Sequence, residues 1–157
     1  MVVKVVGADK AARHLRTVEA NLRDFSIAYE KIGSFYRSQI MVQFQEHGFI
    51  PGVHGPWTPL SENTMRTKDK FKTVPLIASG DLESSLTTRA NPYNINEVGI
   101  HKARFGTSDP IAIFHQRGTN YRGNPHTPER PILLGNRLLD DYIVKSIAEH
   151  LFTGWGK

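Results

Sequence analysis

The sequence predicts an α+β domain in which a long amphipathic N-terminal helix and a C-terminal helix pack on a small antiparallel sheet. Apolar residues recur every three or four positions near both ends of the chain, whereas the middle has short apolar runs separated by turn residues. Gly and Pro gather in long loops. The length of 157 residues, with 39% hydrophobic residues, fits a single domain, residues 1–157, with one core.

The N-terminal helix is predicted by one apolar stripe, which we expect to face the core. Its members are Leu15, Val18, Leu22, Phe25, Tyr29, Ile32, Tyr36, Ile40 and Phe44. Asp9 is expected to cap the start, residues 21–24 to break the helix in two, and His47–Gly48 to end it. Gly33 interrupts the stripe at a cost of about 1 kcal/mol relative to alanine. We therefore expect another chain segment to approach closely at Gly33.

A loop rich in Gly and Pro follows over residues 48–59, and it carries Trp57. Loops of this length in a compact domain are usually functional or mobile. After the loop, Ser61 is expected to cap a short helix that runs to about Arg66, because its hydroxyl can accept a backbone N–H that lacks a helical partner.

The strands are predicted in the middle of the chain. The turn Leu76–Leu82 should lead into a strand near Glu83–Ala90, and two short strands should follow near Ile95–Ile100 and Ala103–Gly106. The apolar residues change phase between the last two strands, so one strand cannot keep them all on one face. A turn or bulge at His101–Lys102 should therefore separate them.

Two helices are predicted after the strands. Asp109 and Pro110 are suited to start a short helix over residues 111–116, and residues 119–131 then form a second loop rich in Gly and Pro. In the C-terminal helix, Asn136 can act as the N-cap. Asp140 and Asp141 are placed near its positive end, His150 near its negative end, and Gly154 can close it. The expected buried stripe is Leu139, Ile143, Ile147 and Leu151.

Composition and motifs give no support to catalysis. The chain has no cysteine, which excludes disulfides, thiolate nucleophiles and cysteine-ligated metals. Its seven histidines include no pair at the helical spacing of a catalytic zinc site, and neither Gly-x-Ser-x-Gly nor a phosphate-binding loop is present. We therefore expect no catalytic, metal or cofactor-binding residues and predict that the protein is not an enzyme.

Charge and hydropathy restrict the partners. No apolar run approaches the ~20 residues that cross a bilayer, and the first seven residues are too short for a signal peptide, so we expect a soluble protein without a membrane partner. The net charge of +5 and the pI of about 9.6 favour anionic partners. A nucleic-acid-binding module with a basic surface is therefore the alternative function. The densest basic stretch, residues 66–72, is interrupted by an acid, and a solvated loop is favoured there over phosphate contacts.

Trp57 leaves two interpretations open. A tryptophan in a loop of Gly and Pro can fold back onto its own domain. It can equally anchor in a neighbouring subunit, since tryptophan is enriched at the energetic centres of interfaces.

Several short motifs follow one another in an order that resembles the phage virion morphogenesis family, the Mu-G-like tail-completion proteins. They are Trp57-Thr58-Pro59-Leu60-Ser61 with Thr64 and Lys68, then Leu76–Leu82, then Phe105–Thr119 with His115-Gln116, and finally Pro128–Gly135 with Arg130-Pro131. Ile111 and Ile132 depart from the family pattern, which often has tyrosine and phenylalanine there. The resemblance spans nearly the whole chain.

The resemblance implies a structural virion protein of a tailed bacteriophage: a tail-completion, tail-terminator or neck ring that joins the tail to the head. The implied state is a homo-oligomeric ring, a hexamer, assembled in the host cytoplasm with tail-tube and neck or connector proteins as partners. The basic charge adds the genomic DNA as a passing contact in the ring lumen. We expect residues 48–72 and 119–131 to carry contacts between subunits, because irregular backbone beside a sheet edge invites pairing with another chain. The predicted assembly-interface residues are Trp57, Leu60, Phe105, His115, Gln116, Arg130 and Pro131.

Overall fold

The computed structural model describes residues 7–122, 124–133 and 135–153. Its elements in chain order are α1 (Ala8–Arg23), α2 (Ser26–Gln45), α3 (Glu62–Thr67), α4 (Asp81–Thr87), β1 (Asn94–Val98), β2 (Ala103–Thr107), α5 (Pro110–Arg117), β3 (Thr119–Tyr121), β4 (Asn124–Thr127) and α6 (Arg137–Leu151). The strands form two separate antiparallel hairpins, β1–β2 and β3–β4. The α+β class is confirmed.

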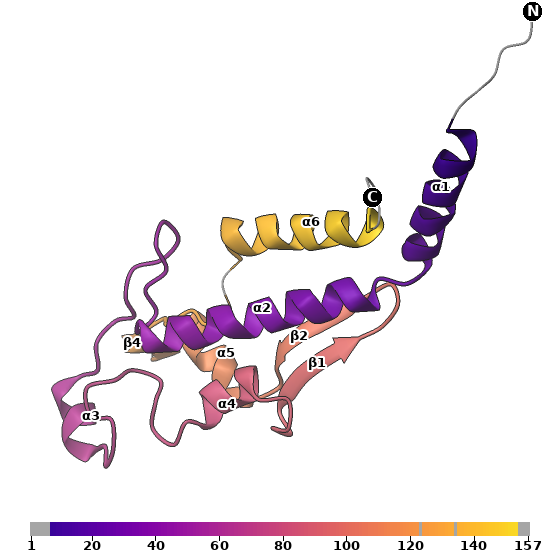
Figure 1. The fold of residues 1–157 in the computed structure, drawn as a ribbon. Coiled ribbons are helices and arrows are strands. Elements are labelled where there is room, and N and C mark those ends of the chain that lie inside the picture. The colour runs from indigo at the N-terminus through magenta and orange to yellow at the C-terminus, as the bar shows by residue number, and fades with distance from the viewer. Residues whose placement is uncertain (1–6, 123, 134, 154–157) are drawn as a thin grey trace, which may run out of the picture.

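Helix α2 is the centre of the molecule (Figure 1). Helix α6 packs along one side of it, and α4 with the β1–β2 hairpin covers the other side. The α6 side is fixed by the stacked rings of Phe35 and Tyr142, whose centroids are 3.9 Å apart. The C-terminal helix therefore packs on α2, on the side away from the strands, rather than on a sheet face.

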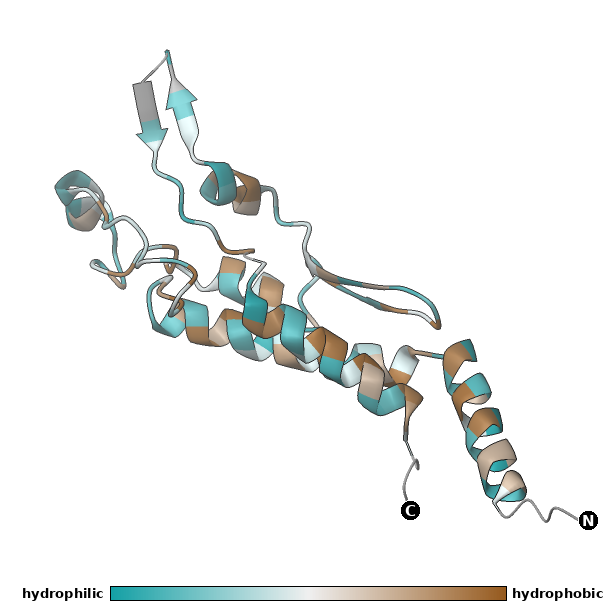
Figure 2. Ribbon diagram, turned by 90° about the horizontal axis from the view of Figure 1, so that it is seen from above, coloured by the Kyte–Doolittle hydropathy of each residue, from teal (hydrophilic) through white to brown (hydrophobic). Residues whose placement is uncertain are grey.

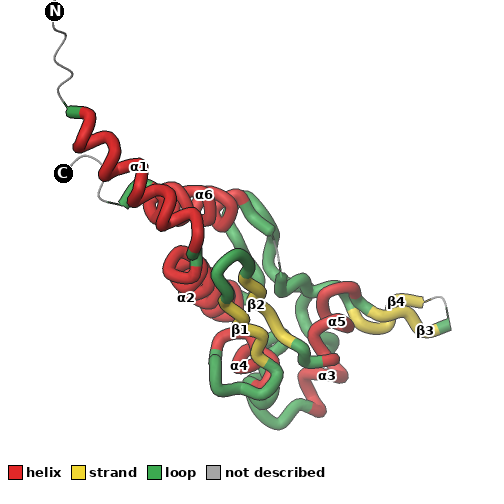
Figure 3. Tube along the Cα trace, turned by 90° about the vertical axis from the view of Figure 1, so that its right-hand side faces the viewer, coloured by secondary structure: helices red, strands yellow, loops and turns green. Residues whose placement is uncertain are grey.

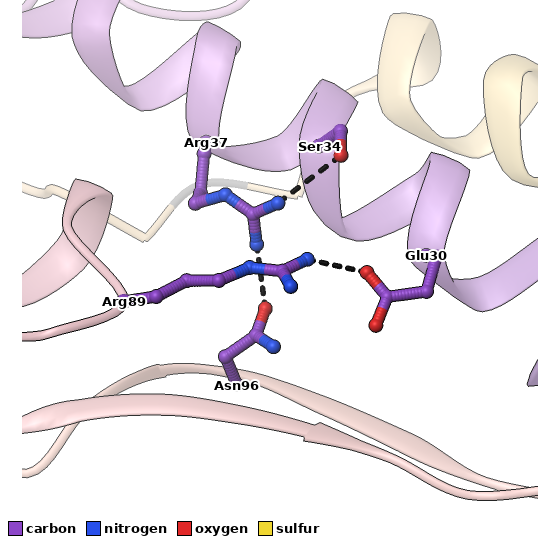
Figure 4. A network of polar contacts seen from close by, with 5 residues as sticks. All are labelled: Glu30, Ser34, Arg37, Arg89 and Asn96. Carbon is purple, nitrogen blue, oxygen red and sulfur yellow. Dashed lines mark hydrogen bonds and ion pairs between the residues drawn. The ribbon is translucent and has the colours of Figure 1, made fainter.

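Polar side chains join α2 to the elements on the hairpin side (Figure 4). The Arg37 guanidinium of α2 donates to Asn96 Oδ1 of β1 at 2.5 Å and to Ser34 Oγ at 3.1 Å. Beside it, Arg89, from the turn after α4, forms an ion pair with Glu30 of α2. Burial, with a smaller contribution from the Arg89 charge, lowers the pKa of Arg37. These contacts hold the first strand and the preceding turn against the central helix.

The core is one cluster between α2, α4 and two irregular segments. Its buried members are Ile40, Phe44, Trp57, Leu82, Leu86 and Ile132. Phe44 and Trp57 meet edge to face with centroids 5.2 Å apart. Gly48, with a φ of 90°, ends the α2 region and lets the Trp57 ring lie directly against its backbone.

Gly33 serves the close approach that its place in the stripe predicts. A side-chain carbon at this position would collide with the ring of Phe105 on β2. That ring also lies 6.0 Å from the ring of Tyr36, measured between centroids. The prediction of a close chain crossing at Gly33 is confirmed.

Most predicted helix boundaries are confirmed. Ser61 accepts a hydrogen bond from the backbone N–H of Thr64, Asp109 accepts from Ile111, and Asn136 accepts from Leu139. The break near residues 21–24 separates α1 from α2. The turn between β1 and β2 is closed by a hydrogen bond from Gly99 N–H to the Lys102 carbonyl, as the change of phase predicts.

Three local predictions are wrong. Residues 83–90 were expected to form a strand, but α4 occupies Asp81–Thr87, with Leu82, Ser85 and Leu86 buried at helical spacing. Asp9 does not cap α1: Gly7 is the N-cap, and Asp9 lies in the first turn. Residues 119–131 are not wholly a loop, since they include the β3–β4 hairpin. Gly154 lies outside the described residues.

The two predicted stripes are buried to different extents. Helix α1 has no buried residue, although the sequence pattern predicts one continuous core-facing stripe through α1 and α2. In α6 the four stripe residues are only half-buried, and Ser146 and His150 are the buried side chains. The predicted core-facing role is therefore correct for the α2 part of the N-terminal stripe and wrong for its α1 part.

Candidate assembly surface

Three segments far apart in the sequence meet beside the core and are joined by hydrogen bonds. We call them together the motif junction: residues 57–60, 115–116 and 130–133. Six of the seven predicted interface residues belong to it. Only Phe105 lies elsewhere, against Gly33 and Tyr36.

Trp57 is buried in its own subunit, with 3% of its surface exposed. Its indole N–H donates to the carbonyl of Pro131 at 2.9 Å, and the Gln43 amide donates to the same carbonyl at 2.9 Å. Of the two interpretations left open for Trp57, the structure shows the first, in which the ring folds back onto its own domain. Because almost none of its side chain is exposed in the single subunit, a contact of Trp57 with a neighbouring subunit stays a prediction.

Arg130 holds the loop before α3 by its backbone. Its guanidinium donates to the carbonyls of Thr58 and Pro59, at 2.8 and 3.2 Å, and its backbone N–H donates to the carbonyl of His115 at 2.7 Å. Only 5% of Arg130 is exposed, so this side chain too is occupied within the subunit. Burial lowers the pKa of Arg130, yet a guanidinium remains charged at neutral pH.

Gln116 connects α5 to the third segment of the junction. Its carbonyl oxygen accepts the backbone N–H groups of Ile132 and Leu133, both at 2.9 Å, and its amide donates to the Leu133 carbonyl at 3.2 Å. A glutamine thereby makes the hydrogen bonds that a neighbouring strand would make. This satisfies irregular backbone that would otherwise lack partners.

His115 is half-buried next to Arg130. Burial lowers the pKa of the imidazole, the Arg130 charge lowers it further, and the Asp109 carboxylate partly opposes the change. Its Nδ1 atom is buried and has no hydrogen-bond partner among the residues that the structure describes. The fold thus favours the neutral form of this histidine.

Leu60, Phe105, His115, Gln116 and Pro131 are all half-buried. Their part in contacts between subunits stays a prediction. What the structure adds is that the motif residues first build the subunit, because they fix two irregular segments against the core. Sequence reasoning missed Gln43, whose only signal was a polar residue at the edge of a buried stripe.

A model of the phage virion morphogenesis family matches residues 6–151. The chain belongs to the phage virion morphogenesis family. No curated protein and no solved structure gives a significant match. Family membership makes this a bacteriophage structural and morphogenesis protein associated with the virion.

In a virion morphogenesis protein, apolar surface that a single subunit leaves exposed is a candidate for contact with other chains. Helix α1 projects from the end of α2 and carries both apolar and polar residues along its length (Figure 2). Leu15 and Leu22 are 62% and 50% exposed. We call Ala8, Ala11, Ala12, Leu15 and Leu22 the α1 stripe. An amphipathic helix with its apolar face in water is unusual in a finished assembly.

A second uncovered apolar surface lies at the other end of α2. The C-terminal half of α2, the following loop and the start of α6 enclose a groove of about 370 Å³. Its apolar lining includes Val42, Phe49, Ile50, Val53 and Leu138, and all of these except Ile50 are more than 40% exposed. We call this the α2–α6 groove.

The β3–β4 hairpin extends away from the body of the molecule, on the side opposite α1 (Figure 3). It contains a register shift between Thr119 and Asn120. Two-stranded hairpins without further packing are marginally stable in water and leave strand edges open. The hairpin is therefore a third candidate contact element.

The basic stretch 66–72 is partly used inside the subunit. The Lys68 ammonium donates to the carbonyls of Phe71 and Val74, at 2.9 and 2.7 Å. Burial, followed by the Arg130 charge, lowers the pKa of Lys68. One of the lysines counted toward a phosphate-binding surface is thus a structural residue of the loop.

Within the described ranges, no three His, Asp or Glu side chains come close enough together to hold a metal ion. Helices long and apolar enough to span a membrane are likewise not found in the described part of the chain.

Proposed function

We propose that this protein is a tail-completion, tail-terminator or neck component that works as a ring of identical copies and joins the phage tail to the head. The single observation that supports this is the uncovered apolar surface at both ends of an elongated subunit. Surfaces of this kind mark contacts with other chains. Copies that meet through two different surfaces form a ring when the rotation between them closes.

The ring that we propose is a hexamer whose neighbours are tail-tube and neck or connector proteins, with genomic DNA as a passing contact in the lumen. The family assigns a role in virion morphogenesis, and the proposal adds the subunit number, the partners and the position in the particle. The support for this placement is the uncovered apolar surface together with membership of the family.

The test has two parts. Native mass spectrometry of the purified protein should give one closed oligomer whose mass is six times that of the 17.7 kDa chain. Electron microscopy of lysates made by a phage that lacks the gene should show DNA-filled heads separate from finished tails. A chain that stays monomeric at all concentrations, or mutant particles in which heads and tails remain joined, would refute the role.

A further inference from the structure

We propose that the α1 stripe of one copy lies in the α2–α6 groove of the next copy, so that subunits join head to tail. The inference rests on the proposed ring function and names the two surfaces that would form its repeated contact. A helix with one apolar face and a groove with an apolar lining are complementary in the way that many helical segments are recognised.

The first argument is the position of the two surfaces. The stripe begins before the N-terminal end of α2, and the groove lies at its C-terminal end (Figure 1). The part of α2 from Ser26 to Gln39, where the groove begins, separates the two by about 20 Å. A contact between them joins unlike surfaces of two molecules, which is the geometry that repeats around a ring.

The second argument is that a subunit cannot fill its own groove with α1. The C-terminal end of α1 is fixed to the end of α6: the Asn21 amide donates to the carbonyls of His150 and Leu151, at 2.8 and 3.3 Å. In return, His150 Nε2 lies 3.1 Å from the Asn21 carbonyl and 2.7 Å from the Asp24 carbonyl. These contacts direct α1 away from the groove of its own subunit, so an α1 helix that lies in this groove belongs to another copy.

The third argument is charge. Helix α1 carries Lys10, Arg13, Arg16 and Arg23 against Asp9 and Glu19. The charged residue that lines the groove, Arg137, pairs with Asp141 at 3.7 Å. Two further exposed carboxylates follow lining residues by one helical turn: Glu46 after Val42, and Asp140 after Asn136. A basic helix beside an acidic rim favours this pairing over the pairing of two α1 helices, in which like charges would meet.

The experiment uses the full-length chain and two variants, each disabling one surface. Leu15→Glu with Leu22→Glu places charges in the stripe, and Val42→Glu with Leu138→Glu places them in the groove. All four residues are at least 48% exposed in the isolated subunit, so both variants should keep the wild-type circular dichroism spectrum and melting temperature. Native mass spectrometry should find each variant alone as a monomer.

The matched controls add the same charge elsewhere. Thr17→Glu with Ala20→Glu changes the opposite face of α1, and Ile27→Glu with Val144→Glu replaces exposed apolar residues of α2 and α6 outside the groove. Both controls should assemble as the wild type does.

Mixing the two variants is the decisive step. The groove variant still has its stripe and the stripe variant still has its groove, so a 1:1 mixture should form a pair that cannot grow. Assembly of either variant alone, or a mixture that stays monomeric, would overturn the docking while leaving the ring function standing if the wild type assembles. A monomeric wild type would overturn both.

Discussion

At the scale of single residues, side chains make the backbone hydrogen bonds that a helix or a neighbouring strand would otherwise make. Gln43, Trp57, Gln116 and Arg130 each reach a backbone group of a segment that has no strand partner. Buried backbone groups without partners are costly. The motif junction therefore explains how a chain with many Gly and Pro residues near its core can still adopt one conformation.

Trp57 gives the first prediction. Trp57→Ala should lower the free energy of unfolding of the subunit by about 3–5 kcal/mol, because a buried indole and its hydrogen bond are both lost. Trp57→Phe should cost less, since a ring still fills most of the space. Urea denaturation followed by circular dichroism measures both, with exposed Phe71→Ala as the control, expected within about 0.5 kcal/mol of wild type. A Trp57→Ala protein as stable as wild type would show that the ring is not a core residue.

His115 gives a prediction in pH. The folded-state pKa lies below the ordinary value of 6.5, so the unfolded chain takes up the proton first as the pH falls. The stability that the neutral imidazole provides is present above about pH 6.5 and is lost as the pH falls through the folded pKa. The melting temperature of His115→Gln should therefore fall less than that of wild type between about pH 7.5 and about pH 5.5. Equal losses would contradict this, and exposed His101→Gln serves as the control.

At the scale of elements, α1 depends on one small contact. Asn21 and His150 hold its C-terminal end to α6, while no residue of α1 is buried. Elements with few buried contacts open locally at low cost. The position of α1 is thus set by hydrogen bonds at one end and not by packing along its length.

Asn21→Ala should release α1 without unfolding the body. Hydrogen exchange in residues 8–23 should become faster, while the free energy of global unfolding changes by only about 1 kcal/mol. Hydrogen–deuterium exchange with mass spectrometry reads the two effects separately, and Asn63→Ala in α3 is the matched control. Unchanged protection of α1 would mean that the Asn21 amide does not hold the helix.

Elements whose signals are local were predictable. Three helix starts could be predicted from their N-cap residues, Ser61, Asp109 and Asn136. An N-cap hydrogen bond involves only the capping side chain and a backbone N–H two or three residues later. The strand prediction at Glu83–Ala90 is wrong because this stretch is short and mixed in polarity, so its apolar spacing does not distinguish a helix from a strand. Helix α4 starts after Gly80, whose φ of 90° no apolar pattern reveals. The β3–β4 hairpin has no alternating apolar pattern to mark it.

The sequence predicts which residues come together at the motif junction, but not whether they contact their own subunit or a neighbouring one. The motifs select residues that converge in the fold, yet a sequence pattern does not say whether a tryptophan fills its own core or a neighbour's pocket. The α1 stripe has the same ambiguity. A helical period predicts a covered face, and whether the cover belongs to the same chain is a property of the assembly.

At the scale of the whole molecule, the elongated subunit has an uncovered apolar surface at each of its two ends, while its net charge is +5. The first feature favours self-association, and the second favours contact with nucleic acid. Both can hold in one ring, because they involve different forces.

Salt dependence distinguishes self-association from DNA binding. Raising the ionic strength from about 0.05 M to about 0.5 M should leave the oligomer mass unchanged, because apolar contacts are not screened, but should abolish retention of duplex DNA. Analytical ultracentrifugation and a filter-binding assay measure the two effects on the same sample. Dissociation of the oligomer in parallel with the loss of DNA would favour a nucleic-acid-binding module over a ring held by apolar contacts.

The way α1 is attached has a mechanical consequence. A rod of about 24 Å held only at its base acts as a lever, and a tilt of about 10° there moves its tip by about 4 Å. Neighbouring copies joined through such levers can change their spacing while each body stays rigid. A collar built in this way could widen or tighten to meet two differently sized faces, one above it and one below.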